Sequence, residues 1–390
     1  MRFAISFSGK RPLGHVLKAK AIGEETVLVQ SREFSSTEDG QHFIQRLEGY
    51  PQQVLSMIQE QCGEHVAPST VHSMVVVVDR DLNATACINE GFGATSMRSS
   101  GPLAAGQSVY KNDIADFEKV SLEISVPDDA GVMFLFSLGW RKGYYYDFIP
   151  LNPHAPEDRS YDCEVLLAEL FTYVFFQERF SITEDEWRSL FAARLFPFAG
   201  LKNETIDAIL AHLRSGWDLS NLSDAISNEV SEHLPKFTQS WREHHIIGKQ
   251  MLLLDRAIER FHAEDFVSAT CILMPQIEGM LRTNHSIVGT GKAKQDKLVD
   301  SAVSRKIHRR QSLLLPERFK KYLNAVYFAS FPQELLPGDT SAPMSRHTVS
   351  HGIVADGKFD RLTAAICLLT VHQLFYFFDR LQSDHEGAAE

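Results

Sequence analysis

The stretch Leu151-Asn-Pro-His-Ala-Pro-Glu-Asp-Arg159 separates two parts of the chain that have different hydrophobic patterns. It is rich in proline and polar residues, which is typical of a linker. Before it, short apolar runs alternate with turns, whereas after it apolar residues recur at helical spacing. The sequence therefore predicts an α+β protein, with a mixed α/β part over residues 1-150 and an all-helical C-terminal half.

The N-terminal part contains several strand-like runs and one helical region. Met74-Val-Val-Val-Val-Asp79 is the strongest strand candidate because it is rich in β-branched residues. Val132 to Pro150 predicts a hairpin, with Arg141-Lys142-Gly143 as its turn. Residues 40–62 have the spacing of an amphipathic helix, and Pro51 is expected to begin its second half. Further strands are expected at 3–7, 26–30 and 120–126.

Downstream of the linker almost no strand signal remains. Thr183-Glu-Asp-Glu186 resembles a capping box, which predicts that a helix begins there. We expect a helical connector over residues 160-238 and a final helical block over 240-382. The predicted helices cover 163–179, 203–214, 221–234, 243–262, 264–283, 293–306, 315–330 and 357–381.

The bulk composition excludes several classes of protein. A net charge of −11 argues against a protein that coats nucleic acid by bulk charge alone. The five cysteines form no CxxC pair, so neither a zinc ribbon nor a redox motif is indicated, and reduced thiols in a cytoplasmic protein are expected. No apolar run approaches the roughly 20 residues that cross a bilayer, so we expect no membrane partner.

One short motif carries most of the functional signal. Arg346-His-Thr-Val-Ser-His351 lies between a loop that contains proline and glycine and the last long apolar helix. In this position it resembles the Arg-x4–6-His motif of the HEPN family, in which a polar residue often follows the arginine. Glu278, on the predicted helix 264–283, resembles the acidic residue that faces this motif. The resemblance covers residues 240-382 and implies a HEPN-like helical bundle.

The resemblance implies a metal-independent endoribonuclease that acts as a homodimer, with two motifs meeting in one cleft. RNA would be cleaved by attack of its own 2′-hydroxyl, so no metal or cofactor is implied. His351 would be the general acid or base, and Arg346 would stabilise the phosphate. Glu278 would orient one of them, and His347 would be a further polar group of the catalytic site.

The resemblance leaves the role of this domain open. Similar domains recur among bacterial toxins and anti-phage defence proteins. Many HEPN domains are non-catalytic, so the alternative is a scaffold for dimerisation and for binding RNA or protein.

A basic segment supports RNA as the partner. Between Gly291 and Lys321, ten basic residues are opposed by only three acidic ones. They could bind a phosphate backbone, or they could form a solvated helix pair that faces an acidic surface. The ten residues are Lys292, Lys294, Lys297, Arg305, Lys306, Arg309, Arg310, Arg318, Lys320 and Lys321.

Trp140 to Tyr146 is a second segment with two interpretations. It interleaves aromatic and basic residues, a pattern that can stack nucleobases. In a hairpin, however, alternate residues of each strand must face the core.

Overall fold

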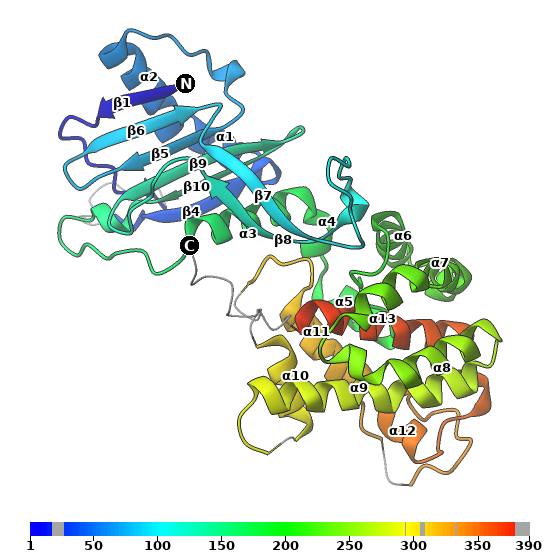
Figure 1. Ribbon diagram of the computed structural model, residues 1–390. Coiled ribbons are helices and arrows are strands. Elements are labelled where there is room, and N and C mark those ends of the chain that lie inside the picture. Colours follow the sequence, from blue (N-terminus) through cyan, green and yellow to red (C-terminus); the bar gives the residue numbers. More distant parts are fainter. Residues whose placement is uncertain (18–26, 293, 305–308, 332–333, 379–390) are drawn as a thin grey trace, which may run out of the picture. The chain divides into compact units, whose positions relative to one another are not determined.

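The predicted α+β fold class is confirmed by the computed structural model, which describes residues 1–17, 27–292, 294–304, 309–331 and 334–378 (Figure 1). Residues 1–97 and 117–177 form one compact unit, here the N-terminal unit. Residues 98–116 and the described residues after Gln177 form the other, here the helical unit. The predicted division into 1-150, 160-238 and 240-382 groups residues differently, and as a division into domains it stays a prediction.

A six-stranded antiparallel sheet forms the centre of the N-terminal unit. Two further pairs join β2 (His15–Val16) to β3 (Val29–Gln30) and β7 (Phe92–Ser99) to β8 (Ile114–Leu122). Strand β8 overlaps the strand predicted at 120–126, but it begins and ends earlier in the sequence than expected. The order across the sheet is β1 (Arg2–Ser6), β6 (Asn83–Ile88), β5 (Met74–Val78), β9 (Gly131–Leu138), β10 (Arg141–Asp147) and β4 (Arg32–Ser36).

Helices cover both faces of this sheet. On one face, Val76 and Val78 pack into a core with α1 (Gln41–Leu47) and α2 (Tyr50–Cys62). On the other face lies α3 (Cys163–Phe175), whose Phe171 ring centroid is 4.5 Å from that of Phe136 on β9. Because a central strand is then buried on both sides, β5 is a continuous apolar run rather than an alternating one. Pro51 lies in the first turn of α2, so the second half of the predicted helical region 40–62 begins about where the sequence predicted.

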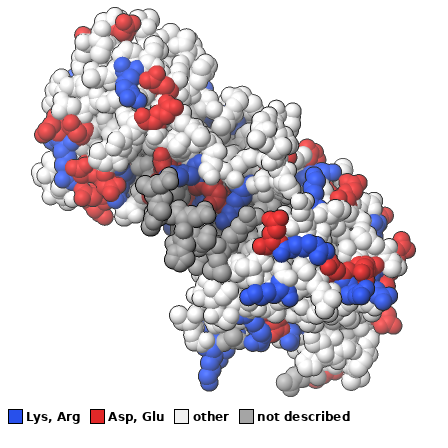
Figure 2. Space-filling view, viewed as in Figure 1, with Lys and Arg blue, Asp and Glu red and all other residues white. Residues whose placement is uncertain are grey.

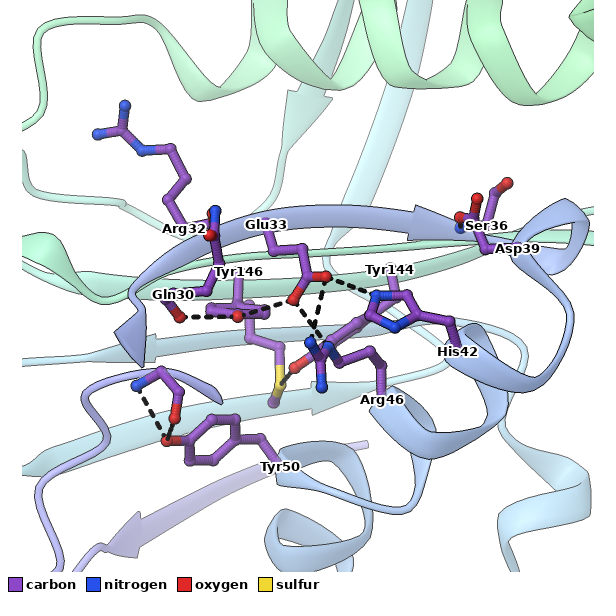
Figure 3. A network of polar contacts seen from close by, with 12 residues as sticks. Gln30, Arg32, Glu33, Ser36, Asp39, His42, Arg46, Tyr50, Tyr144 and Tyr146 are labelled. Carbon is purple, nitrogen blue, oxygen red and sulfur yellow. Dashed lines mark hydrogen bonds and ion pairs between the residues drawn. The ribbon is translucent and has the colours of Figure 1, made fainter. Parts of the chain in front are cut away.

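A four-membered polar network ties the edge strand β4 to α1 and β10 (Figure 3). Arg46 donates from Nε to Glu33 Oε2 over 2.7 Å, and the Tyr146 hydroxyl donates to the same oxygen over 2.9 Å. His42 Nε2 lies 2.6 Å from Glu33 Oε1. Burial would raise the pKa of Glu33, but the hydrogen bonds from Arg46, His42 and Tyr146 outweigh burial and lower it.

The β9–β10 hairpin turns earlier than the sequence predicted. Leu138 pairs with Arg141, so the loop consists of residues 139–140, and the predicted turn at 141–143 is wrong. Gly139 has a φ of +65°, which suits the first position of a two-residue hairpin loop. Gly143 has a different role, because a Cβ there would lie 2.3 Å from the ring of Phe136.

The helical unit is built around α13 (Arg361–Phe377), which is buried along almost its entire length and packs against α7 (Ser223–Arg242) and α9 (Phe266–Val288). Its apolar residues surround the helix, so it lacks the polar face of a surface helix. The capping box at Thr183 is confirmed at the start of α5. Besides short 3-10 turns, the described residues after α3 also form α4 (Gln177–Phe180), α5 (Glu184–Ala192), α6 (Asn203–Arg214), α7 (Ser223–Arg242), α8 (Met251–His262), α9 (Phe266–Val288), α10 (Gln295–Val303), α11 (Pro316–Tyr322), the π-helical turn η7 (Leu323–Tyr327) and α12 (Arg346–Ser350).

Candidate active site

The Arg-x4-His motif forms a short helix of its own, α12, which the sequence pattern did not predict. Ser345 caps its first turn, since its hydroxyl accepts from the Thr348 N–H. Gly352, with a φ of +65°, ends the helix, and its N–H donates to the Val349 carbonyl. These caps fix Arg346 at the first position of the helix and His351 at its end.

Glu278 on α9 contacts the motif. Arg346 forms an ion pair with Glu278 through its Nε atom. The carboxylate is mostly buried, with 10% of its side chain exposed, and 29% of the Arg346 side chain is exposed. Within the part of the chain that the structure describes, no hydrogen bond from the Arg346 Nη atoms is found. The guanidinium is thus held along one edge, and its two Nη groups remain available.

The two histidines of the motif lie one helical turn apart, on the same side of α12. The His351 N–H donates to the His347 carbonyl over 3.0 Å. His351 is exposed, and its ring centroid is 6.0 Å from that of Phe331. His347 is half-buried, and its Nε2 lies 3.2 Å from Gln295 Oε1.

The pKa of His347 lies below its ordinary value of 6.5. Burial is the largest cause, followed by the positive charge of Arg346, while Glu278 opposes both. His351 makes a smaller contribution in the same direction. A neutral imidazole at pH 7 can accept a proton.

The predicted RNA-binding residues that the structure describes differ in exposure and in their partners. Lys292, Lys294 and Lys297 are exposed and flank Gln295 in sequence, so the contact from Gln295 to His347 brings this basic group beside the motif. Arg310 is exposed, and Lys321 is exposed near Glu184 of α5. Arg305 and Lys306 lie outside the described residues.

Three other basic residues of this segment have acidic partners. Arg309 is buried, and its Nη1 lies 3.6 Å from Asp116, which is itself buried. Lys320 pairs with Asp300 at 2.8 Å, and Arg318 pairs with Glu184. On the face drawn in Figure 2, lysine and arginine side chains are interspersed with aspartate and glutamate side chains.

The structure adds residues that the sequence pattern did not single out. Arg282, one turn after Glu278, donates from Nε to Glu278 Oε1 over 2.9 Å. Its spacing from the glutamate was a detectable signal, because residues four apart meet on a helix. The contacts of Gln295 and Phe331 had no such signal, since neither residue is close to the motif in sequence.

The aromatic residues of the segment Trp140 to Tyr146 differ in their exposure to solvent. Tyr144 and Tyr146 are buried in the core, and Tyr145 is buried on the opposite face of the sheet. Trp140 is 73% exposed at the hairpin loop, where the Arg141 guanidinium lies 5.1 Å from its ring centroid.

Searches of protein-family models, curated proteins and solved structures find no match to this chain. Within the described ranges, each helix is too short or too polar to cross a lipid bilayer. The residues that the structure describes also bring together no three histidine, cysteine, aspartate or glutamate side chains that could hold a metal ion.

Proposed function

We propose that this protein is a metal-independent endoribonuclease whose catalytic residues are Arg346, His347 and His351, with Glu278 as a positioning residue. The observation that carries the proposal is the meeting of the Arg-x4-His motif with Glu278 at the contact between α9 and α12. Because Glu278 holds the Nε edge of Arg346, the Nη groups can present a two-donor fork to a phosphate.

The proposed reaction uses the substrate as its own nucleophile. A base removes the proton of the 2′-hydroxyl, and that oxygen attacks the adjacent phosphorus. The bond from phosphorus to the 5′-oxygen breaks, and an acid protonates this leaving group. The products are a 2′,3′-cyclic phosphate and a 5′-hydroxyl.

Two histidines one helical turn apart on α12 suit these two proton transfers. His351 is exposed and therefore accessible to a bound RNA strand. His347 has a lowered pKa, so it is neutral at pH 7 and can act as the base. Arg346 would stabilise the charge that develops on the phosphate oxygens.

RNA and a second copy of the chain are the proposed partners. Lys292, Lys294 and Lys297 give the motif a basic border that suits a phosphate backbone. The resemblance to HEPN nucleases suggests a homodimer with two motifs in one cleft. It also suggests a role as a toxin or an anti-phage defence effector in the cytoplasm.

A second candidate is a non-catalytic scaffold that dimerises and binds RNA or protein. The observation that favours it is the ion pair between Arg346 and Glu278, since a paired and partly buried arginine can serve stability alone. In that case His351 would be an ordinary surface residue.

Cleavage of a mixed RNA pool in EDTA tests the proposal. We expect the wild type to cut RNA, and we expect Arg346→Ala and His351→Ala to lose at least about 100-fold in rate. Arg256→Ala and His262→Ala are matched controls, because they alter an exposed Arg-x5-His sequence on α8 and should cut normally. Folded, dimeric wild type that does not cut would favour the scaffold, and equal cutting by all variants would place the chemistry elsewhere.

A further inference from the structure

Glu278 holds two arginines rather than one. Arg282 reaches Glu278 Oε1 with Nε at 2.9 Å and with Nη2 at 2.7 Å, whereas Arg346 pairs with Oε2. Two guanidinium groups around one carboxylate leave one positive charge without a counterion in this cluster. An anion bound there would restore the charge balance.

Arg282 is well placed to contact such an anion. More than half of its side chain, 54%, is exposed, although both Nε and Nη2 are fixed by the carboxylate. Its Nη1 has no hydrogen-bond partner among the described residues. An exposed guanidinium that is already oriented loses less side-chain entropy when it binds a ligand than a free one does.

We propose that Arg282 binds a second phosphate of the RNA, next to the one that is cleaved. This inference rests on the proposed function, in which the Arg346 fork holds the scissile phosphate. Because both guanidinium groups contact the same Glu278 carboxylate, one bound strand could contact both arginines through neighbouring phosphates. The preferred substrate is then a strand with a phosphate on at least one side of the scissile bond.

A purely structural Arg282 would behave differently. If it only holds Glu278 in place, its loss disturbs Arg346 and slows the cleavage of every substrate by the same factor. If it binds a phosphate, its loss affects only substrates that carry the extra phosphate. The dependence on substrate therefore separates the two roles.

The experiment compares three dinucleotides that each have one cleavable bond: NpN, pNpN and NpNp. We expect the wild type to cleave pNpN or NpNp about tenfold or more faster than NpN, the effect of one charge-assisted contact at a partly exposed site. In Arg282→Gln the ratio of the pNpN or NpNp rate to the NpN rate should fall to about one, whatever the rate of NpN cleavage itself. Arg256→Gln is the control, because that arginine is in an exposed ion pair with Glu259 on α8 and should keep the advantage.

Binding of 2′-O-methyl analogues separates failure of this inference from failure of the proposed function. These analogues lack the attacking hydroxyl, so their affinity can be measured by displacement of a labelled 2′-O-methyl oligonucleotide. If the wild type binds the analogues with the extra phosphate more tightly, through Arg282, but cleaves no RNA, the nuclease proposal is wrong and the phosphate site stands. A wild type without preference, or a preference that survives Arg282→Gln, would overturn the inference.

Discussion

Replacement of Glu33 by glutamine tests whether the polar network of the N-terminal unit stabilises the fold. The Glu33 and Arg46 side chains are only 16% and 12% exposed. The Glu33 carboxylate also accepts a hydrogen bond from the Tyr146 hydroxyl (Figure 3). Removal of one charge from a buried pair costs about 3–5 kcal/mol. Because both side chains keep some contact with water, and glutamine keeps one acceptor oxygen, we expect Glu33→Gln to lower the free energy of unfolding by about 2–3 kcal/mol.

Urea denaturation at pH 7, with hydrogen exchange at β4 and β10 to locate the effect, measures this loss. Asp158→Asn is the matched control, because Asp158 pairs with Arg80 at 2.7 Å but is 64% exposed. It should change the free energy of unfolding by less than about 0.5 kcal/mol. A small effect of both variants would refute the idea that burial makes the Glu33 pair stabilising.

The same pair predicts a pH dependence. Folding lowers the pKa of Glu33 below its ordinary 4.5, so the ionised carboxylate stabilises the folded state. This contribution is complete above the unfolded pKa and is lost as the pH falls through the folded pKa. The difference between wild type and Glu33→Gln should therefore be full at pH 7 and shrink below about pH 4.5. A difference that persists unchanged into that range would contradict the electrostatic explanation.

One further substitution in each unit tests a buried contact. Gly143→Ala should destabilise the N-terminal unit by about 1–3 kcal/mol in urea denaturation, because its Cβ would lie 2.3 Å from the buried ring of Phe136. Gly357→Ala, with no atom near its Cβ, should be close to neutral. Asp116→Asn should destabilise the helical unit by about 2–3 kcal/mol, because the buried carboxylate faces Arg309 and accepts two hydrogen bonds. A change below about 0.5 kcal/mol in thermal or urea unfolding would show that this pair is dispensable.

The sequence predicted best those features that depend on neighbours along the chain. Helix α6 has the predicted bounds, and α5 begins at the predicted capping box of Thr183. The hairpin of β9 and β10 was predicted, but its turn was misplaced because Gly139 and Gly143 are equally plausible turn residues in a sequence. Only the structure shows that Gly143 is needed for its close approach to Phe136.

Features that depend on distant partners could not be predicted. The basic segment was recognised by its local charge, but the burial of Arg309 depends on Asp116, and the pairing of Arg318 depends on Glu184. The motif was identified by its resemblance to a known family, and the expectation that Glu278 faces it rested on the same resemblance. The position of Gln295 against His347 had no signal in the sequence. The helix at 346–350 was not predicted, although Ser345 and Gly352 are typical cap residues.

Two arginines of the helical unit, each paired with a carboxylate, differ in whether a ligand can reach them. Arg309 is 8% exposed as a side chain and faces a carboxylate that is fully buried, so a ligand has no access to it. Arg346 is 29% exposed and faces a carboxylate that keeps contact with solvent. An ion pair that is open to water contributes less to stability than a shielded one, because solvent and salt screen it. Partial exposure leaves the Arg346 guanidinium accessible to a ligand beside the exposed His351, which is the condition that the proposed phosphate binding requires.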